Sequence, residues 1–144
     1  AEIAEETERH IDYAKRFRTN EFVIHDRVDA ISHATCGMAI DIGAKVIVVT
    51  SMSGMTVRMV SRFRAPTDIV GMATNKRVWY KLSLSWGVLP VLSEQFNSTD
   101  VLFYHALRAA RDTMHLQPGD NVVMTGGITN GKSGNTNLIK IEAV

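Results

Sequence analysis

A glycine-rich loop near the C-terminus carries the pattern that cradles phosphate in nucleotide-hydrolysing enzymes. Residues 126–133 read GGITNGKS and match G-x-x-x-x-G-K-[ST] in full. In those enzymes the loop joins a strand to a helix, and the N-terminus of that helix holds the phosphates. Here the residues that follow, 135–141, have the composition of a strand. We therefore predict that the loop connects two strands and binds phosphate in another way.

A second loop, over residues 50–56, has side chains that suit an oxyanion. It offers three hydroxyl donors and a glycine that lets the backbone approach a ligand: Ser51, Ser53, Thr56 and Gly54. A helix is predicted to begin here, and the first N–H groups of a helix have no internal partner. Alternatively, Ser53 only caps its own helix, which is worth ~1 kcal/mol. Lys132 favours phosphate, because a cation on a glycine-rich flap can close over an anion held by the first loop.

Helical and strand patterns alternate along the chain, and each loop follows a predicted strand. The spacing of Ile3, Thr7, Ile11 and Ala14 predicts an N-terminal helix, with a loop near residue 20. Further helices are predicted over 26–42, from 53, over 75–84 and over 97–116. Strands are predicted over 45–49, 68–72, 87–91, 121–125 and 135–141. This order predicts one three-layer α/β/α domain over residues 1–144, with a five-stranded, mostly parallel sheet whose last strand is antiparallel.

The predicted helices have buried faces that can be read from their spacing. In the second helix, Cys36 is predicted to be a small core-facing residue, and the expected buried stripe is Ile24, Val28, Ile31, Thr35, Met38 and Ile42. In the long helix the expected inward residues are Phe103, Leu107, Ala110 and Met114. In such sheets ligands bind beyond the carboxyl ends of the strands. If the strands before the two loops are neighbours, the loops face one crevice.

Composition excludes several classes of function. The net charge is +1 and the basic residues look scattered along the chain, so we expect neither nucleic acid nor a membrane as partner. A single cysteine rules out an internal disulfide and favours a reducing cytoplasm. The five histidines form no ligand motif, and no carboxylates have metal-binding spacing. We therefore predict neither a metal nor a cofactor in this domain.

Several segments, in order, resemble the C-terminal domain of pyruvate kinase. They are DAISHAT at 29–35, GAKVIVVT at 43–50, SGMT at 53–56, RMVSRFRAP at 58–66, WGVLP at 86–90, PGD at 118–120, TGG at 125–127 and GNTNLIKI at 134–141. The resemblance covers essentially the whole chain. It implies a fragment: residues 1–20 would lead from a catalytic barrel, which transfers phosphate from phosphoenolpyruvate to ADP with Mg and K. On this expectation the fragment alone carries no catalytic residue and is inactive.

The resemblance also implies a role for the two loops. In the family this domain binds a phosphorylated effector and packs against another C-terminal domain in a tetramer. The family's phosphate-binding loop falls on Ser51, Ser53, Gly54 and Thr56. Its effector loop falls on 127–135, which includes Gly127, Lys132, Ser133, Gly134 and Asn135. We predict that the second loop becomes ordered over bound phosphate and biases the contact between subunits, an effect usually worth ~1–3 kcal/mol.

The chain departs from family members that use a sugar bisphosphate. Residues 93–107 contain no lysine or arginine, while Glu94 and Asp100 add negative charge. A second phosphate would lose its hydration without a compensating cation. We therefore expect a sugar monophosphate or AMP. Two alternatives stay open: a purely structural domain between subunits, with no working pocket, and a free-standing nucleotide-dependent enzyme, against which the missing helix after Ser133 argues.

Overall fold

The computed structural model describes residues 1–127 and 135–144. The helices are α1 (Glu2–Arg9), α2 (Tyr13–Thr19), α3 (Arg27–Asp41), α4 (Met55–Arg62), α5 (Lys76–Leu82) and α6 (Thr99–Met114). The strands are β1 (Val46–Thr50), β2 (Asp68–Ala73), β3 (Val88–Leu92), β4 (Asn121–Gly127) and β5 (Thr136–Ala143). The predicted strands agree with these bounds to within two residues at each end.

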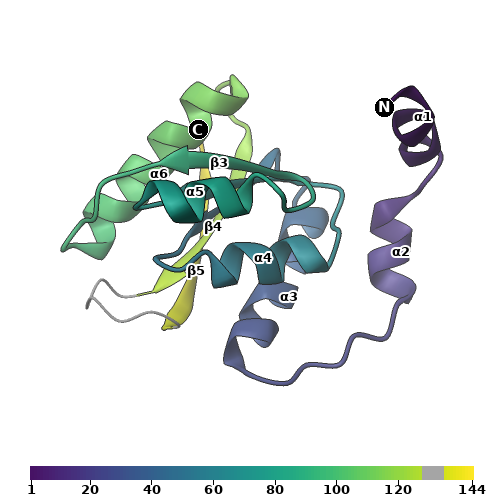
Figure 1. Cartoon of the computed structure of the whole chain (residues 1–144), viewed down its shortest axis with the longest axis horizontal. Helices are drawn as coiled ribbons and strands as arrows, with labels where there is room; N and C mark the ends of the chain where they lie inside the picture. The colour runs from purple at the N-terminus through teal and green to yellow at the C-terminus, as the bar shows by residue number, and fades with distance from the viewer. Residues whose placement is uncertain (128–134) are drawn as a thin grey trace.

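The five strands form one mixed sheet in the order β3-β2-β1-β4-β5 (Figure 1). β1 is parallel to both β2 and β4, β2 is parallel to β3, and β4 is antiparallel to β5. The predicted fold class is thus confirmed. β1 is an unbroken run of β-branched residues, VIVVT, because it lies at the centre of the sheet and is buried on both faces.

Helices cover both faces of the sheet and create two cores. α3, α4 and α5 cover one face around Ile47, Val49 and Val123. α6 alone covers the other face, where Phe103 and Ala110 pack against Val48 and Met124 with Leu107 and Met114 at the margin. The predicted inward face of the long helix is therefore confirmed. Together the helices and sheet make the three layers that the alternating pattern predicted.

The buried face of α3 differs from the predicted stripe. Of the six predicted residues only Thr35 is fully buried, and Met38 remains 39% exposed. The helix instead buries Asp29, Ser32, Thr35, Cys36 and Ala39, which are small or polar. Small residues let α3 approach its neighbours, and Asp29 is tolerated because its carboxylate accepts a charged hydrogen bond from Arg62 at 3.2 Å. Hydrophobic spacing alone therefore misplaced this face.

Cys36 is a core residue, as predicted. Its side chain has no exposed surface, and its thiol lies 3.7 Å from the carbonyl oxygen of Val60 on α4. Burial raises the pKa of the Cys36 thiol to about 12, because a buried thiolate would lose its hydration. At neutral pH the group is a protonated thiol, which suits packing rather than nucleophilic chemistry.

The N-terminal segment forms two helices rather than the predicted one. The break falls after His10, because the side chain of Asp12 accepts a hydrogen bond from the Lys15 N–H at 3.0 Å and starts α2. α1 and α2 form an arm beside the body in Figure 1. α1 has no buried residue, whereas α2 buries Phe17 against Phe22 and Phe63.

The arm contacts the body at Trp86 as well. Its indole N–H donates to the carboxylate of Glu8 at 3.1 Å, and its ring lies 5.0 Å from the ring of Tyr13. The arm therefore joins the body mainly through aromatic rings.

No helix in the described part of the chain is long and apolar enough to cross a bilayer.

Candidate functional site

The candidate site lies where the winding of the sheet changes direction. β2 and β3 follow β1 on one side, whereas β4 pairs with β1 on the other side, from Val46 opposite Val122 to Val49 opposite Thr125. Parallel neighbours end at the same edge of a sheet, so the residues after β1 and after β4 lie side by side there. The strands before the two loops are neighbours, so the turn over residues 51–56 and Gly127 leave the sheet at the same edge. Lys132, Ser133 and Gly134, also predicted for the site, lie outside the described residues.

The turn between β1 and α4 is held by its own serines. The hydroxyl oxygen of Ser51 accepts from the Gly54 N–H at 3.1 Å, and that of Ser53 accepts from the Met55 N–H at 3.3 Å. Each hydroxyl can still donate its own proton. At the start of α4, the N–H groups of Thr56 and Val57 have no acceptor within the helix. The turn therefore presents two serine hydroxyls at the positive end of a helix, an arrangement that suits an anion, whereas Thr56 and Val57 are buried.

Gly54 is the N-cap of α4, so Ser53 does not cap the helix in the predicted way. Its φ of +78° lies in the left-handed region, which favours glycine. A Cβ on Gly54 would lie 2.9 Å from Val78 and 3.2 Å from Leu82, both on α5. The glycine is thus required for packing against α5 as well as for the turn. The sequence predicts that Gly54 lets the backbone approach a ligand, whereas the close contact in the structure is with a neighbouring helix.

A pair of buried threonines ties the two loops together. The hydroxyls of Thr56 and Thr136 are 2.7 Å apart, and the two residues are only 2% and 7% exposed. Thr56 therefore has an internal partner and is less available to a ligand than the two serines. Sequence reasoning missed Thr136. Its signal was its position directly after the glycine-rich loop, at the start of a strand that pairs with β4.

Two glycines at the end of β4 allow close contact. A Cβ on Gly126 would collide with the hydroxyl of Thr50, and one on Gly127 would collide with Asn135. Thr50 donates a hydrogen bond to the Thr125 carbonyl at 3.3 Å, across from β1 to β4. The register of the β4–β5 pair shifts between Gly126 and Gly127. These glycines are thus explained by packing where the chain leaves β4.

The threonine pair gives a prediction about stability. Replacing Thr136 with valine is expected to lower the free energy of unfolding by about 1–3 kcal/mol, because the buried Thr56 hydroxyl loses its partner. Urea denaturation followed by circular dichroism measures the change. Thr136→Ser keeps the hydroxyl and is the control, with a smaller loss from one missing methyl. Equal losses in the two variants would show that the hydrogen bond contributes nothing.

The first turn of α5 adds two cations to this edge of the sheet. Lys76 and Arg77 are exposed and directly precede Val78, the residue that Gly54 contacts. The sequence contained the signal, since Asn75 begins this helix at the end of β2 and its side chain accepts from the Val78 N–H at 3.0 Å. Positive charge near the turn adds to its preference for anions.

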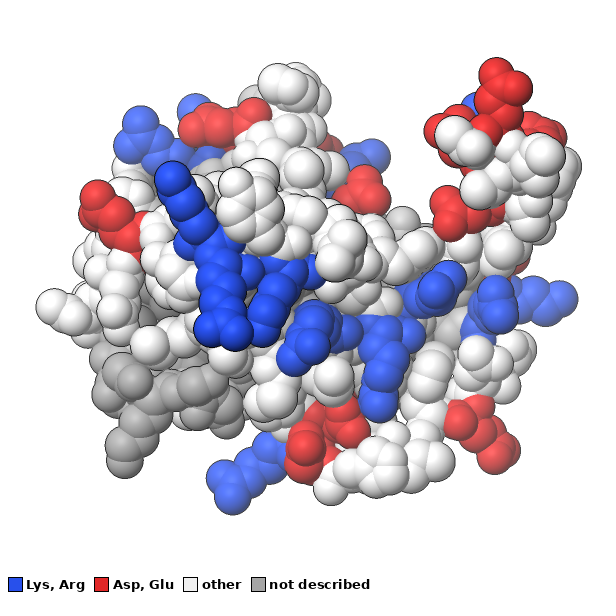
Figure 2. Space-filling model, in the orientation of Figure 1, with Lys and Arg blue, Asp and Glu red and all other residues white. Residues whose placement is uncertain are grey.

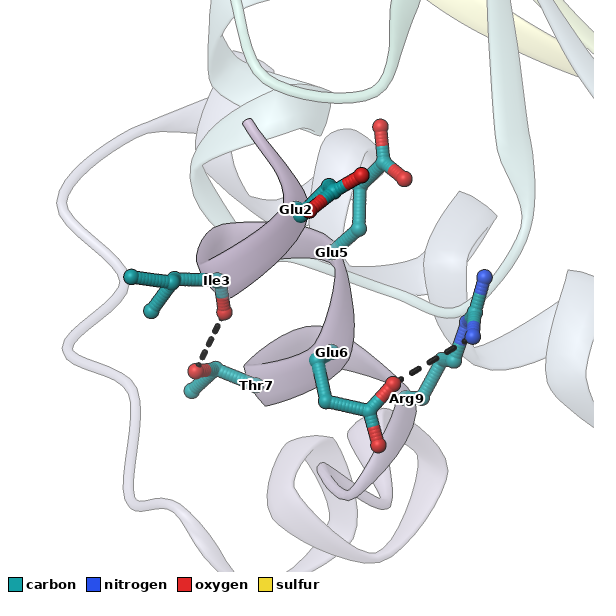
Figure 3. Close-up of a pocket in the computed structure, with 6 residues that line it drawn as sticks. All are labelled: Glu2, Ile3, Glu5, Glu6, Thr7 and Arg9. Carbon is teal, nitrogen blue, oxygen red and sulfur yellow. Dashed lines mark hydrogen bonds and ion pairs between the residues drawn. The ribbon is translucent and has the colours of Figure 1, made fainter.

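A hollow along α1 does not suit phosphate. This hollow of about 630 Å³ is lined by Glu2, Ile3, Glu5, Glu6, Thr7 and Arg9, all from one helix (Figure 3). The guanidinium of Arg9 is paired with the carboxylate of Glu6 at 3.3 Å. The carboxylates of Glu2 and Glu5 give the hollow a negative character. Among the described residues, no group of three or more His, Cys, Asp or Glu side chains could hold a metal ion. The turn over residues 51–56 remains the best candidate.

Strand order and switch point define the class of protein: a doubly wound, three-layer α/β domain. Residues 29–142 match the family model "Pyruvate kinase, alpha/beta domain". Pyruvate kinase of Clostridium acetobutylicum is 35% identical over the whole chain, which covers 31% of that protein. Pyruvate kinase of Staphylococcus saprophyticus is 32% identical over 99% of the chain and 24% of its own length. The chain belongs to the pyruvate kinase family and corresponds to its C-terminal domain.

A solved structure supports the fold. A pyruvate kinase from Cryptosporidium parvum superimposes with a TM-score of 0.81 over 94% of this chain and 27% of that chain, at 23% identity. The chain thus spans about a quarter to a third of the length of these relatives. The resemblance stated from the sequence is confirmed at the level of family and fold.

Proposed function

We propose that this domain is the regulatory and oligomerisation part of a pyruvate kinase, and that it binds a phosphorylated effector at residues 51–56. The observation that carries the proposal is the turn itself, with the hydroxyls of Ser51 and Ser53 beside the N-terminus of α4. These donors match the oxygens of a phosphate. The cations of α5 support an anionic ligand in the same place.

The rest of the proposal concerns the whole enzyme. Phosphate transfer from phosphoenolpyruvate to ADP, with Mg and K, is assigned to the catalytic barrel of the same polypeptide. The fragment alone is expected to be inactive. The enzyme is expected in the cytoplasm, as a homo-oligomer joined through C-terminal domains. We keep a sugar monophosphate or AMP as the expected effector, because residues 93–107 contain no lysine or arginine that could neutralise a second phosphate.

A purely structural domain without a working pocket is the second candidate. It is favoured by the packing of Gly54 against α5 and by the Thr56–Thr136 pair, since both explain the turn without a ligand. The two candidates differ in one measurable property. An effector that binds only the folded state stabilises it, by about 2.7 kcal/mol at a concentration of 100 times Kd.

The test is titration calorimetry with glucose 6-phosphate, AMP and fructose 1,6-bisphosphate, together with thermal unfolding. We expect a monophosphate to bind and to raise Tm by several degrees. Ser53→Glu is expected to weaken binding at least tenfold, because it places a carboxylate where the phosphate binds. Ser53 is exposed, so the variant should fold. Ser83→Glu, at the far end of α5, has the same change in charge and is the control.

Two outcomes would contradict this proposal. If no phosphorylated ligand changes Tm, the structural candidate is favoured. If the bisphosphate binds more tightly than every monophosphate, the pocket is real but the charge argument for a single phosphate is wrong.

A further inference from the structure

Positive charge is concentrated on the outer face of α4 and α5. These two helices contain five basic residues and no acidic one. Figure 2 shows Lys and Arg side chains gathered on the face that both helices present to the viewer. We call Arg58, Arg62, Lys76, Arg77 and Lys81 the basic surface. The scattered appearance of basic residues in the sequence was misleading, because packing on one side of the sheet brings the two helices together.

The basic surface is largely without neutralising partners. Arg62 pairs with Asp29, but the other four side chains are exposed and make no ion pair with a described carboxylate. Across the whole chain 16 basic and 15 acidic residues nearly balance. The excess on these two helices is therefore local. Unpaired cations on adjacent helices produce a positive potential that attracts an anionic partner.

Apolar side chains accompany these cations on α5. Tyr80 is 65% exposed and Leu84, just after the helix, is 90% exposed. Arg77, Tyr80 and Lys81 follow the spacing i, i+3 and i+4, which places them on one face of α5, and Leu84 follows two residues after the helix ends. This face therefore combines cations with exposed apolar surface, a composition common at protein-binding sites.

We infer that the basic surface docks an acidic protein segment that also carries an apolar side chain. Carboxylates would pair with the guanidinium and ammonium groups, and the apolar side chain would cover Tyr80 and Leu84. The observations favour this partner over nucleic acid, since Tyr80 is the only ring exposed on α4 or α5 and stacking of bases needs several. They also favour it over a membrane, which needs a broad apolar face for insertion.

The basic surface shares Lys76 and Arg77 with the edge beside the proposed effector site, so the variants that test it change Arg58 and Lys81 instead. A binding test can use a fluorescein-labelled peptide of about twelve residues, made of repeated Glu-Glu-Leu-Glu, with the full chain. Fluorescence anisotropy in about 50 mM NaCl is expected to show saturable binding. Affinity is expected to fall at least about fivefold in 300 mM NaCl, because exposed ion pairs are screened by salt. No binding in low salt would overturn the inference.

Matched variants locate the binding surface. Arg58→Glu with Lys81→Glu is expected to weaken peptide binding at least about tenfold, because both attractions become repulsions. Arg108→Glu with Arg111→Glu makes the same change in net charge on α6, across the sheet, at two exposed positions. This control is expected to bind the peptide as the unaltered chain does. Equal weakening in both variants would mean that net charge alone attracts the peptide.

A second comparison tests the apolar part and the class of partner. Replacing the leucines of the peptide with glutamine is expected to weaken binding at least about threefold to the unaltered chain. The same replacement should have no effect on the variant Tyr80→Ser with Leu84→Ser. An effect of equal size in both proteins would contradict the apolar contact. Tighter binding of a single-stranded oligonucleotide, or of phosphatidylserine vesicles, would overturn the choice of an acidic protein segment.

Discussion

Replacing Phe63 with alanine is expected to lower the free energy of unfolding by about 3–5 kcal/mol, the range for a buried aromatic residue. Phe63 is 2% exposed at the end of α4, where its ring lies 4.9 Å from Phe22 and 5.3 Å from His33. The guanidinium of Arg62 lies 4.8 Å from the centre of the same ring. One substitution therefore removes contacts with the connection before α3, with α3 itself and with α4.

The loss should also release the N-terminal arm. Phe17 is the one buried residue of α2, and the centre of its ring lies 6.4 Å from that of Phe63. In the variant, α2 should therefore be cut at protease concentrations that leave the body intact. Urea denaturation measures the stability, and the slope of free energy against urea should fall, because a released arm leaves less surface to expose on unfolding. Tyr80→Ala, at a residue 65% exposed, is the control and should change stability by less than about 0.5 kcal/mol. A loss below about 1.5 kcal/mol for Phe63→Ala would contradict the packing role.

Gly54→Ala is expected to cost about 2–5 kcal/mol of unfolding free energy. The left-handed backbone accounts for about 1–2 kcal/mol. Overpacking accounts for about 1–3 kcal/mol more, since the new methyl would lie 2.9 Å from Val78. The variant should also displace the turn over 51–56 and weaken any anion bound there. Denaturation and calorimetry on the same protein measure both effects.

Gly43→Ala separates the two contributions. Gly43 has a φ of +61°, and no atom lies within 4 Å of the position its Cβ would take. The Gly43→Ala variant should therefore lose only the unfolding free energy that comes from the left-handed backbone, about 1–2 kcal/mol. If both variants lose the same free energy, the contact of the turn with α5 has no energetic weight.

The strands could be predicted from the sequence because their signal is local. A strand buried on both faces needs a continuous apolar run, and residues 46–49 show one. The face of α3 could not be predicted in the same way. The buried Asp29 is paired with Arg62, far along the chain, and apolar spacing contains no information on that pair. The break after His10 did have a local signal, the capping side chain of Asp12, but the helical spacing of apolar residues spans it.

In the candidate site, too, local features could be predicted from the sequence and long-range contacts could not. Ser51, Ser53 and the helix start are neighbours in sequence, so their common turn was predictable. The bond from Thr56 to Thr136 joins residues 80 positions apart and depends on which strands are neighbours. The packing of Gly54 against α5 likewise depends on the order of the helices over the sheet. The sequence therefore predicted the contacts within the turn. It did not predict the contacts that depend on which strands and helices are neighbours.

The place of β1 in the sheet has a consequence for biosynthesis. β1 emerges from the ribosome first among the strands but ends up in the middle, with β2 on one side and β4 on the other. After residue 92, when β3 is complete, one edge of this apolar strand still has no partner, and it waits until residues 121–127 have been added. Nascent chains that end between residues 92 and 121 expose the unpaired backbone groups of this edge. We expect such chains to bind chaperones and to associate with one another.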